Sequence, residues 1–245
     1  GGVRVKENIM NTEEYWRLWD ESLLRTLGLN LNPSFGAEFE FKDVPLEKIR
    51  GTISLIEDIF TKIIKKRDQD GVSREITRLD CTRLSYELQG ELKKNGIKSI
   101  LVTGDYVFHG EPMYNVSEKY IFSQLGASSP GMGLHTWLVL DNYLLVDPSI
   151  IIFNEKEKFL AKEIDGKPYI TDIEKINSDL FYIPFVLGEE YLIKINALHS
   201  ISDVLLPDVD VKGDLHANAL SEPSRNTLCP CDSGDKYKYC CGKLT

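Results

Sequence analysis

Two groups of residues in this 245-residue sequence have the types and spacing that chemistry requires. The first group is four of the five cysteines, which fall in a short C-terminal stretch: Cys229, Cys231, Cys240 and Cys241. The second group is the fifth cysteine, Cys81, together with His135 and Asp147. The first group offers donor atoms for a metal ion, and the second offers a nucleophile, a base and a carboxylate.

The four C-terminal cysteines predict a structural zinc site. Four thiolates complete the tetrahedral coordination of zinc, at Zn–S distances of about 2.3 Å. Such a short segment can bury almost no core of its own, so metal binding would supply most of its folding free energy. With four protein ligands no position stays open for a substrate, and we expect one structural Zn²⁺ ion. An iron site or an oxidised tail is the alternative that these residues leave open.

Cys81 is a candidate nucleophile because of where it stands. A lone cysteine is more often a small buried hydrophobe, but this one lies at the start of a predicted helix, where the positive end of the helix dipole stabilises a thiolate. His135 opens and Asp147 closes a predicted β-hairpin. The set predicts Cys81 as nucleophile, His135 as general base and Asp147 as the group that orients the base. A core cysteine and an unrelated structural histidine remain the alternative.

The register of the hairpin decides whether His135 can reach Asp147. A two-residue turn at Asp141-Asn142 would place the two side chains on opposite faces of the sheet. A three-residue loop, residues 140–142 with Asn142 in the left-handed conformation, would place His135 directly opposite Asp147. Directly opposed residues have Cβ atoms about 5 Å apart, within reach of a carboxylate–imidazole contact. We predict the three-residue loop.

The elements that position these residues follow from hydrophobic spacing and capping signals. In the first helix, Trp16, Trp19, Leu23 and Leu27 recur at helical spacing and predict the buried face. His109 falls in a long predicted loop of the kind that is often functional, whereas His199 and His216 have no partner in the pattern. The predicted elements are helices at 11–28, 45–66 and about 80–94, a strand at 97–102, a loop at about 103–133, the hairpin at 135–148 and short mixed elements over 150–205.

Composition and charge limit the classes of partner. The net charge is −9, which argues against nucleic-acid binding by the main domain, because phosphate neutralisation needs a basic face. No apolar run reaches the roughly 18 residues of a membrane span, and no leader pattern is present. An odd number of cysteines without a leader is typical of a reducing compartment. We therefore expect a cytoplasmic protein that does not enter a membrane.

The stretch from Asp80 to Gly104, with His135-Thr-Trp137 and Tyr143–Pro148, resembles the nucleophile helix and the His and Asp strands of the transglutaminase-like (papain-like) cysteine protease superfamily. The resemblance implies an α+β core in which N-terminal helices and a nucleophile helix pack on an antiparallel sheet. It also implies acyl transfer through a thioester at Cys81, as in peptidases, deamidating or cross-linking acyltransferases, arylamine acetyltransferases and peptide N-glycanases. The Cys81 backbone N–H is the expected oxyanion donor; the sequence does not identify a second.

The run from Arg225 to Lys243 is similar to the SEC-C zinc motif found at the end of the preprotein translocase motor ATPase. Asp232 stands where glycine is usual, but all four ligands are in place. The resemblance implies docking to a protein partner. It divides the chain into a hydrolase domain (1–206), a linker (207–224) and a zinc knuckle (225–245).

Two functions fit these observations. The first is a cysteine-dependent hydrolase or acyltransferase acting on a protein or peptide amide, with the zinc knuckle docking it to a partner protein. The second is a catalytically silent adaptor in which the papain-like core only binds peptide and the knuckle recruits it.

Overall fold

The computed structural model describes residues 11–33, 39–69, 80–127, 133–150, 167–176 and 179–198. The chain divides into two units, residues 1–198 and 199–245, and every described residue belongs to the first. The predicted boundary at 206, the linker and the knuckle lie outside the described residues and stay predictions. The helices among the described residues are α1 (Thr12–Gly28), α2 (Leu46–Gln69), α3 (Asp80–Lys94), α4 (Glu118–Gln124), the 3₁₀ helix η2 (Ile173–Lys175) and α6 (Glu190–Lys194).

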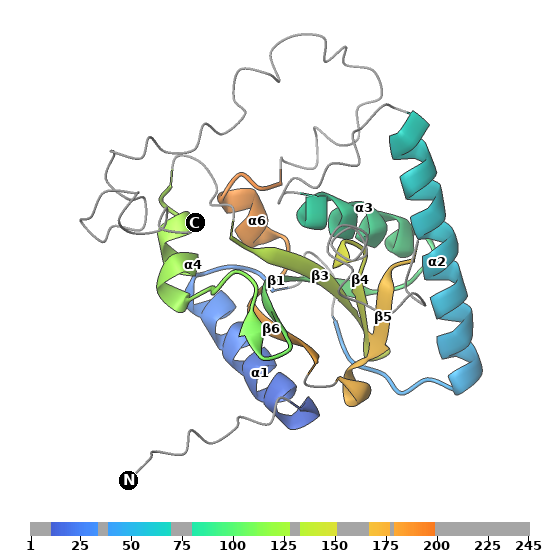
Figure 1. Ribbon diagram of the computed structural model, residues 1–245, viewed down its shortest axis with the longest axis horizontal. Coiled ribbons are helices and arrows are strands. Elements are labelled where there is room, and N and C mark those ends of the chain that lie inside the picture. The colour runs from blue at the N-terminus through green and yellow to red at the C-terminus, as the bar shows by residue number, and fades with distance from the viewer. Residues whose placement is uncertain are drawn as a thin grey trace. The chain divides into compact units, whose positions relative to one another are not determined.

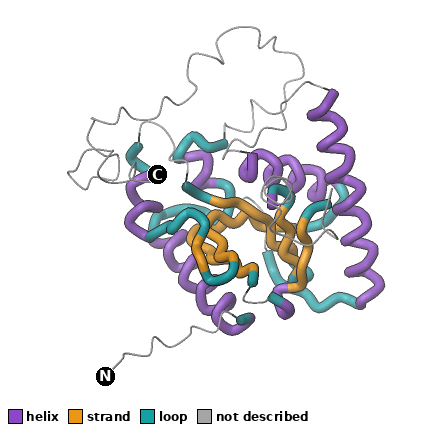
Figure 2. The backbone as a smooth tube through the Cα atoms, viewed as in Figure 1, coloured by secondary structure: helices purple, strands orange, loops and turns teal. Residues whose placement is uncertain are grey.

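The strands form one antiparallel sheet between two layers of helix (Figures 1 and 2). Its order is β2-β1-β3-β4-β5, with β6 pairing the other edge of β1. One face packs on residues of α2 and α3, and the other packs on residues of α1. The predicted α+β class is therefore confirmed. The strands are β1 (Ser99–Phe108), β2 (Glu111–Pro112), β3 (His135–Leu140), β4 (Leu144–Asp147), β5 (Tyr169–Asp172) and β6 (Leu180–Leu187).

Helix α1 forms where it is predicted, but with a different buried face. The Asn11 side chain caps it by accepting the N–H of Glu14 at 3.0 Å. Its buried stripe is Tyr15, Trp19, Ser22 and Thr26. Leu27, predicted to be buried, is 52% exposed. The prediction was wrong because buried hydroxyls can be satisfied locally: Thr26 donates to the Ser22 carbonyl and accepts the N–H of Leu187 in β6.

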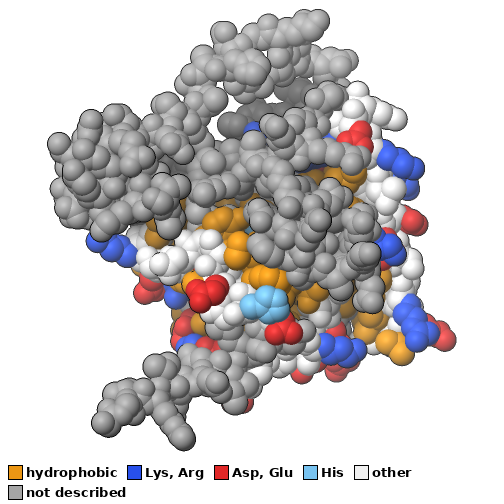
Figure 3. Space-filling model, in the orientation of Figure 1, with side chains coloured by type: hydrophobic (Ala, Val, Ile, Leu, Met, Phe, Trp, Pro, Cys, Tyr) orange, Lys and Arg blue, Asp and Glu red, His pale blue; other side chains and the backbone are white. Residues whose placement is uncertain are grey.

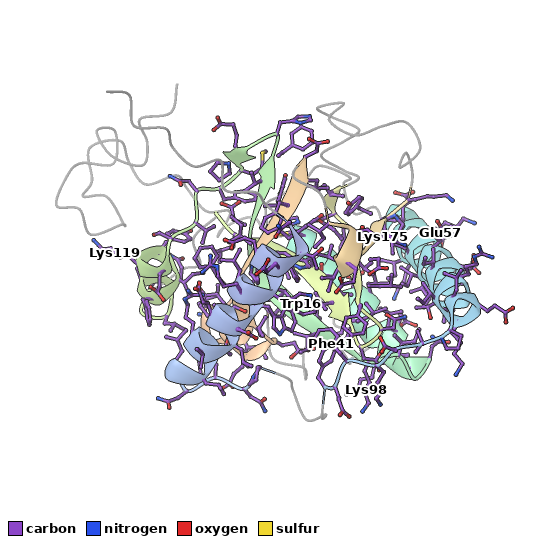
Figure 4. All side chains as sticks on the ribbon, turned by 90° about the horizontal axis from the view of Figure 1, so that it is seen from below. Trp16, Phe41, Glu57, Lys98, Lys119 and Lys175 are labelled. Carbon is purple, nitrogen blue, oxygen red and sulfur yellow. The ribbon has the colours of Figure 1, made fainter. Side chains whose placement is uncertain are left out.

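Aromatic residues extend this layer beyond the helix. The Trp16 and Phe41 rings meet edge to face at 5.1 Å, and both are labelled in Figure 4. Phe41 also stacks on Tyr143 in the β3–β4 loop at 4.9 Å. Such pairs add roughly 0.5–1.5 kcal/mol each beyond area burial. They tie α1 to the hairpin that carries His135 and Asp147.

Strand β1 is longer than predicted, and the region after it is not one loop. It runs to Phe108, and β2 and α4 lie between it and residue 127. Helix α4 begins at a Ser117 cap that accepts the N–H of Tyr120. The predicted loop at 103–133 is thus wrong where the end of β1, β2 and α4 lie. A strand buried along its length on both faces lacks the alternation that marks a half-exposed strand, which hides its end in the sequence.

The β3–β4 hairpin has the predicted loop length in a different register. Its loop is residues 141–143, and Tyr143, rather than Asn142, has a positive φ of 65°. Leu138 pairs with Val146 and Val139 with Leu145, so His135 is not directly opposite Asp147. The register differs from the prediction by two residues, which preserves the side-chain face. His135 and Asp147 are therefore diagonal neighbours on one face of the sheet.

Gly104 of β1 allows the strands around His135 to approach. It pairs with His135 across the sheet, and a side-chain Cβ there would lie 2.0 Å from the Ile183 carbonyl oxygen of β6. The same Cβ would lie 2.9 Å from the Trp137 ring. A β-bulge follows in β6, where the Phe185 carbonyl accepts a hydrogen bond from Arg25 at 2.9 Å. No other residue fits at position 104 without moving backbone.

Gly104→Ala should lower the free energy of unfolding by about 1–3 kcal/mol or more, because its methyl group overlaps a backbone carbonyl rather than a flexible side chain. Urea unfolding followed by circular dichroism measures this change. The matched control is Gly90→Ala on the exposed face of α3, where a Cβ meets nothing within 4 Å. That variant should gain roughly 0.5–1 kcal/mol. A Gly104→Ala protein as stable as the wild type would contradict the steric account.

Candidate active site

Helix α3 is attached to β3 by hydrogen bonds from its polar face. The Thr82 and Thr136 hydroxyls are 3.1 Å apart, and the Ser85 hydroxyl donates to the Thr136 carbonyl at 3.0 Å. These contacts lie in the first turns of the helix. They place Cys81 at the start of β3, where its sulfur is 3.8 Å from the Leu134 carbonyl oxygen. The hydrogen bonds of Thr82 and Ser85 to Thr136 thus bring Cys81 next to His135.

His135 and Asp147 form a fully buried hydrogen-bonded pair. His135 Nε2 lies 2.6 Å from Asp147 Oδ2, and both side chains are 0% exposed. A carboxylate can only accept, so the hydrogen on Nε2 is donated to Asp147. In the neutral imidazole this leaves the lone pair on Nδ1. The predicted base and orienter are in contact, although the contact is diagonal across the hairpin.

Asp147 is held by further donors from two other segments. Its Oδ1 accepts the Ser149 N–H at 2.9 Å, the Ser149 hydroxyl at 2.8 Å and the Ile150 N–H at 3.1 Å. Its Oδ2 also accepts the Tyr182 hydroxyl of β6 at 2.8 Å. Both oxygens therefore have at least two donors. This set favours the ionised carboxylate despite its burial.

The contact between His135 and Asp147 shifts the pKa of each group in the direction that favours its charged form. Burial by itself lowers the pKa of His135, but the charge and hydrogen bond of Asp147, assisted by Cys81, raise it well above its ordinary value. Burial raises the pKa of Asp147, but the charge and hydrogen bond of His135, with the Ser149 donors, hold it below its ordinary value. The balance favours an imidazolium–carboxylate pair at neutral pH.

The second imidazole nitrogen is available to Cys81. His135 Nδ1 is buried and makes no hydrogen bond of standard geometry to the described residues. The Cys81 sulfur is nevertheless near enough to contribute to the raised pKa of His135. Nucleophile–base contacts in ligand-free sites are often loose and tighten when substrate binds. Nδ1 can therefore exchange a proton with Cys81 while Nε2 stays on Asp147.

Four aromatic rings surround the imidazole. The Tyr106 ring meets it edge to face at 4.7 Å, and the rings of Tyr114 and Trp137 lie roughly parallel to it at 6.3 and 6.0 Å. Tyr182, which also bonds to Asp147, lies at 6.3 Å. The Tyr114 segment is held by Asp105, whose buried carboxylate accepts the N–H groups of Tyr114 and Val116. The rings limit water access and keep the imidazole in one orientation.

Several of these residues could not be assigned from the sequence. The bond from Ser149 had a signal in the local sequence. In Asp-Pro-Ser, the Asp side chain commonly accepts a hydrogen bond from the backbone N–H two residues later, which forms an Asx turn. Tyr182 had none, since it comes from a strand 35 residues after Asp147. His109 lies on an exposed turn 3.7 Å from Asp179, away from the triad contacts. The four cysteines predicted to bind zinc, with His199 and His216, lie outside the described residues.

The site lies inside the first unit rather than on its surface. Cys81 is 4% exposed. On the face shown in Figure 3, acidic and basic side chains of the described residues are interspersed and form no extended basic patch. Among the described residues, no helix is both long and apolar enough to cross a membrane. Nor do the described residues hold a group of three or more His, Cys, Asp and Glu side chains that could bind a metal ion.

Comparison with known proteins supports the C-terminal motif. Residues 225–243 match the SEC-C motif. Over 207 residues, 82% of this chain, the sequence is 25% identical to the protein translocase subunit SecA of a Nitratiruptor species, and this match covers 22% of that protein's length. No solved structure matches. Neither match is to a transglutaminase-like protein, so that part of the resemblance stays a prediction.

The raised pKa of His135 leads to a direct titration test. In the wild type, the His135 ring should titrate well above 6.5, because Asp147 holds the imidazolium. In Asp147→Asn the charge of the carboxylate and its hydrogen bond are lost, so burial opposes only the smaller contribution of Cys81, and the pKa of the same ring should fall well below its wild-type value. NMR titration of the histidine Cε1 protons, with His135→Gln to assign the signal, measures both values. Asp58→Asn, on the exposed side of α2, is the control and should leave the titration unchanged. A His135 signal near 6.5 in both proteins would contradict the ion pair.

Proposed function

We propose that this protein is a cysteine-dependent hydrolase or acyltransferase that acts on a protein or peptide amide through a thioester. The single observation that carries the proposal is the buried 2.6 Å contact between His135 Nε2 and Asp147 Oδ2, which leaves Nδ1 for Cys81. A merely structural histidine would use both nitrogens in hydrogen bonds. The transglutaminase-like resemblance and the α+β fold support the same class of chemistry.

The proposed reaction uses the three side chains in sequence. The Cys81 thiolate, its proton held on His135 Nδ1, attacks the substrate carbonyl carbon and forms the S–C bond. The tetrahedral intermediate collapses when the C–N bond breaks and His135 gives its proton to the departing amine. Water or a second amine then attacks the thioester while His135 takes its proton, and the C–S bond breaks so that Cys81 leaves as the thiolate. Asp147 keeps the imidazole in place through both halves and stabilises its charged form.

The zinc knuckle is proposed as the docking element. The matched SEC-C segment contains Cys229, Cys231, Cys240 and Cys241, and this set of thiolates is what tetrahedral zinc requires. When bound, zinc would provide structure rather than reactivity, since the four protein ligands fill its coordination shell. We propose that the folded knuckle recruits the enzyme to a protein partner.

Selective modification of Cys81 tests the enzymatic proposal. At neutral pH and with zinc present, iodoacetamide should alkylate Cys81 faster than the zinc-bound cysteines, and p-nitrophenyl acetate should acylate it. Peptide mapping by mass spectrometry measures both. His135→Ala should slow acylation by at least about 10²-fold, because it removes the general acid–base group. Lys48→Ala, on the exposed side of α2, is the control and should react like the wild type.

The same experiment separates the enzyme from the adaptor. If Cys81 is inert to both reagents in the wild type while the fold is intact, the enzymatic proposal fails. The remaining function is then the silent peptide-binding adaptor. In cells, a biological effect that survives Cys81→Ser would point to the adaptor as well.

Metal analysis tests the knuckle separately. The purified chain should contain about one zinc ion per molecule by inductively coupled plasma mass spectrometry. The double variant Cys240→Ser/Cys241→Ser should lose it, because two thiolates cannot complete the site. Cys81→Ala is the matched cysteine control and should keep its zinc. Iron in place of zinc, or zinc retained by the double variant, would contradict the assignment.

A further inference from the structure

Tyr106 extends from β1 past the start of β3, next to the proposed catalytic groups. Gly104 pairs with His135, and Tyr106, two residues further along the strand, points to the same face of the sheet. Its ring lies 4.7 Å from the imidazole ring. On its other side it pairs with Tyr182 of β6, the residue that donates to Asp147. The side chain thus lies beyond the His–Asp pair on the same face of the sheet.

The hydroxyl of Tyr106 has no function in holding the fold. The side chain is 3% exposed, and its hydroxyl forms no hydrogen bond with the described residues. The neighbouring phenol of Tyr182 differs, because its hydroxyl donates to Asp147. A hydroxyl without a protein partner, next to the proposed reacting groups, is available for a substrate.

The surroundings of Tyr106 keep its proton in place. Burial raises the pKa of Tyr106, and electrostatic interactions with Tyr114, Asp147, Asp105 and Cys81 raise it further. The phenol therefore stays protonated at neutral pH and acts as a donor toward an anion.

Other candidate donors near the imidazole are less suitably placed. The Trp137 indole N–H makes no hydrogen bond of standard geometry to the described residues, but it is buried near the Tyr15 phenol of α1, whose pKa it lowers against the larger effect of burial. The amides of Tyr114 and Val116 are bound to Asp105. Of the rings around the imidazole, that of Tyr106 is the nearest, at 4.7 Å.

We propose that Tyr106 is a further catalytic residue, whose hydroxyl donates a hydrogen bond to the oxyanion of the tetrahedral intermediate. The proposal rests on the acyl-transfer function above and supplies the second donor beside the Cys81 backbone N–H. When the S–C bond forms, the carbonyl π electrons move to oxygen, and the Tyr106 O–H binds that charge without transferring its proton. When the C–N bond breaks, the carbonyl re-forms and the hydrogen bond weakens. A donor placed in advance for this charge is worth about 10²–10³ in rate.

Two reagents separate this role from a general effect on Cys81. Acylation by p-nitrophenyl acetate passes through an oxyanion, whereas alkylation by iodoacetamide displaces iodide at a saturated carbon and forms none. Tyr106→Phe removes only the hydroxyl. We expect it to slow acylation of Cys81 by about 10²–10³-fold and to leave the alkylation rate within about twofold, as measured by stopped-flow absorbance and peptide mass spectrometry.

Tyr191→Phe is the matched control, because that buried hydroxyl donates to the Ile121 carbonyl at 3.1 Å and has no contact with the triad. It should lose stability but acylate at the wild-type rate. Equal acylation by Tyr106→Phe and the wild type would overturn the proposal. A parallel loss of alkylation and acylation would also overturn it, since Tyr106 would then act on the thiolate. Wild-type Cys81 that is alkylated but never acylated would overturn the proposed function itself, and with it this role.

Discussion

The hydrogen bond between His135 and Asp147 is the contact around which the rest of the described structure is arranged. Two groups that both favour the charged form are fully buried at 2.6 Å. Taking the two charges out of water is costly. Their mutual attraction offsets that cost only if the other lone pairs of the carboxylate also accept hydrogen bonds. Ser149, Ile150 and Tyr182 donate these bonds. Removal of His135 would leave the buried Asp147 carboxylate without its charge partner, which costs about 3–5 kcal/mol.

This pair constrains four strands at once. Asp147 ends β4 and needs the backbone turn at Ser149 for one oxygen and β6 for the other. His135 starts β3 and needs β1 close beside it, which Gly104 permits. Helix α3 is then attached to β3 through Thr82 and Ser85. A register shift by one residue in the hairpin would put His135 on the wrong face and undo the whole arrangement.

The sequence predicted the class of fold and the composition of the His–Asp pair, because both depend on local rules. An odd number of loop residues places His135 and Asp147 on the same face of the sheet. That part of the prediction holds even though the predicted pairing differs from the observed one by two residues. The buried face of α1 could not be predicted from its leucines, because Ser22 and Thr26 satisfy their hydroxyls inside the helix and against β6. Tyr182 could not be assigned because its position depends on long-range strand pairing. Contacts of that kind leave no periodic signal in the chain.

The electrostatics also change the mechanism that the sequence suggests. From the residue types alone, His135 is a base that removes the Cys81 proton during attack. With Asp147 raising the pKa of the imidazole, the charged ring is favoured before substrate arrives. The histidine then acts mainly as the acid that protonates the leaving amine, and the imidazolium beside the sulfur stabilises the thiolate. An imidazolium whose pKa is raised too far is a poor general acid. The hydrogen-bond donors on Asp147 counteract this effect, because they disperse the carboxylate charge and so weaken its attraction for the imidazolium. Ser149 and Tyr182 therefore influence proton transfer to the substrate as well as the stability of the fold.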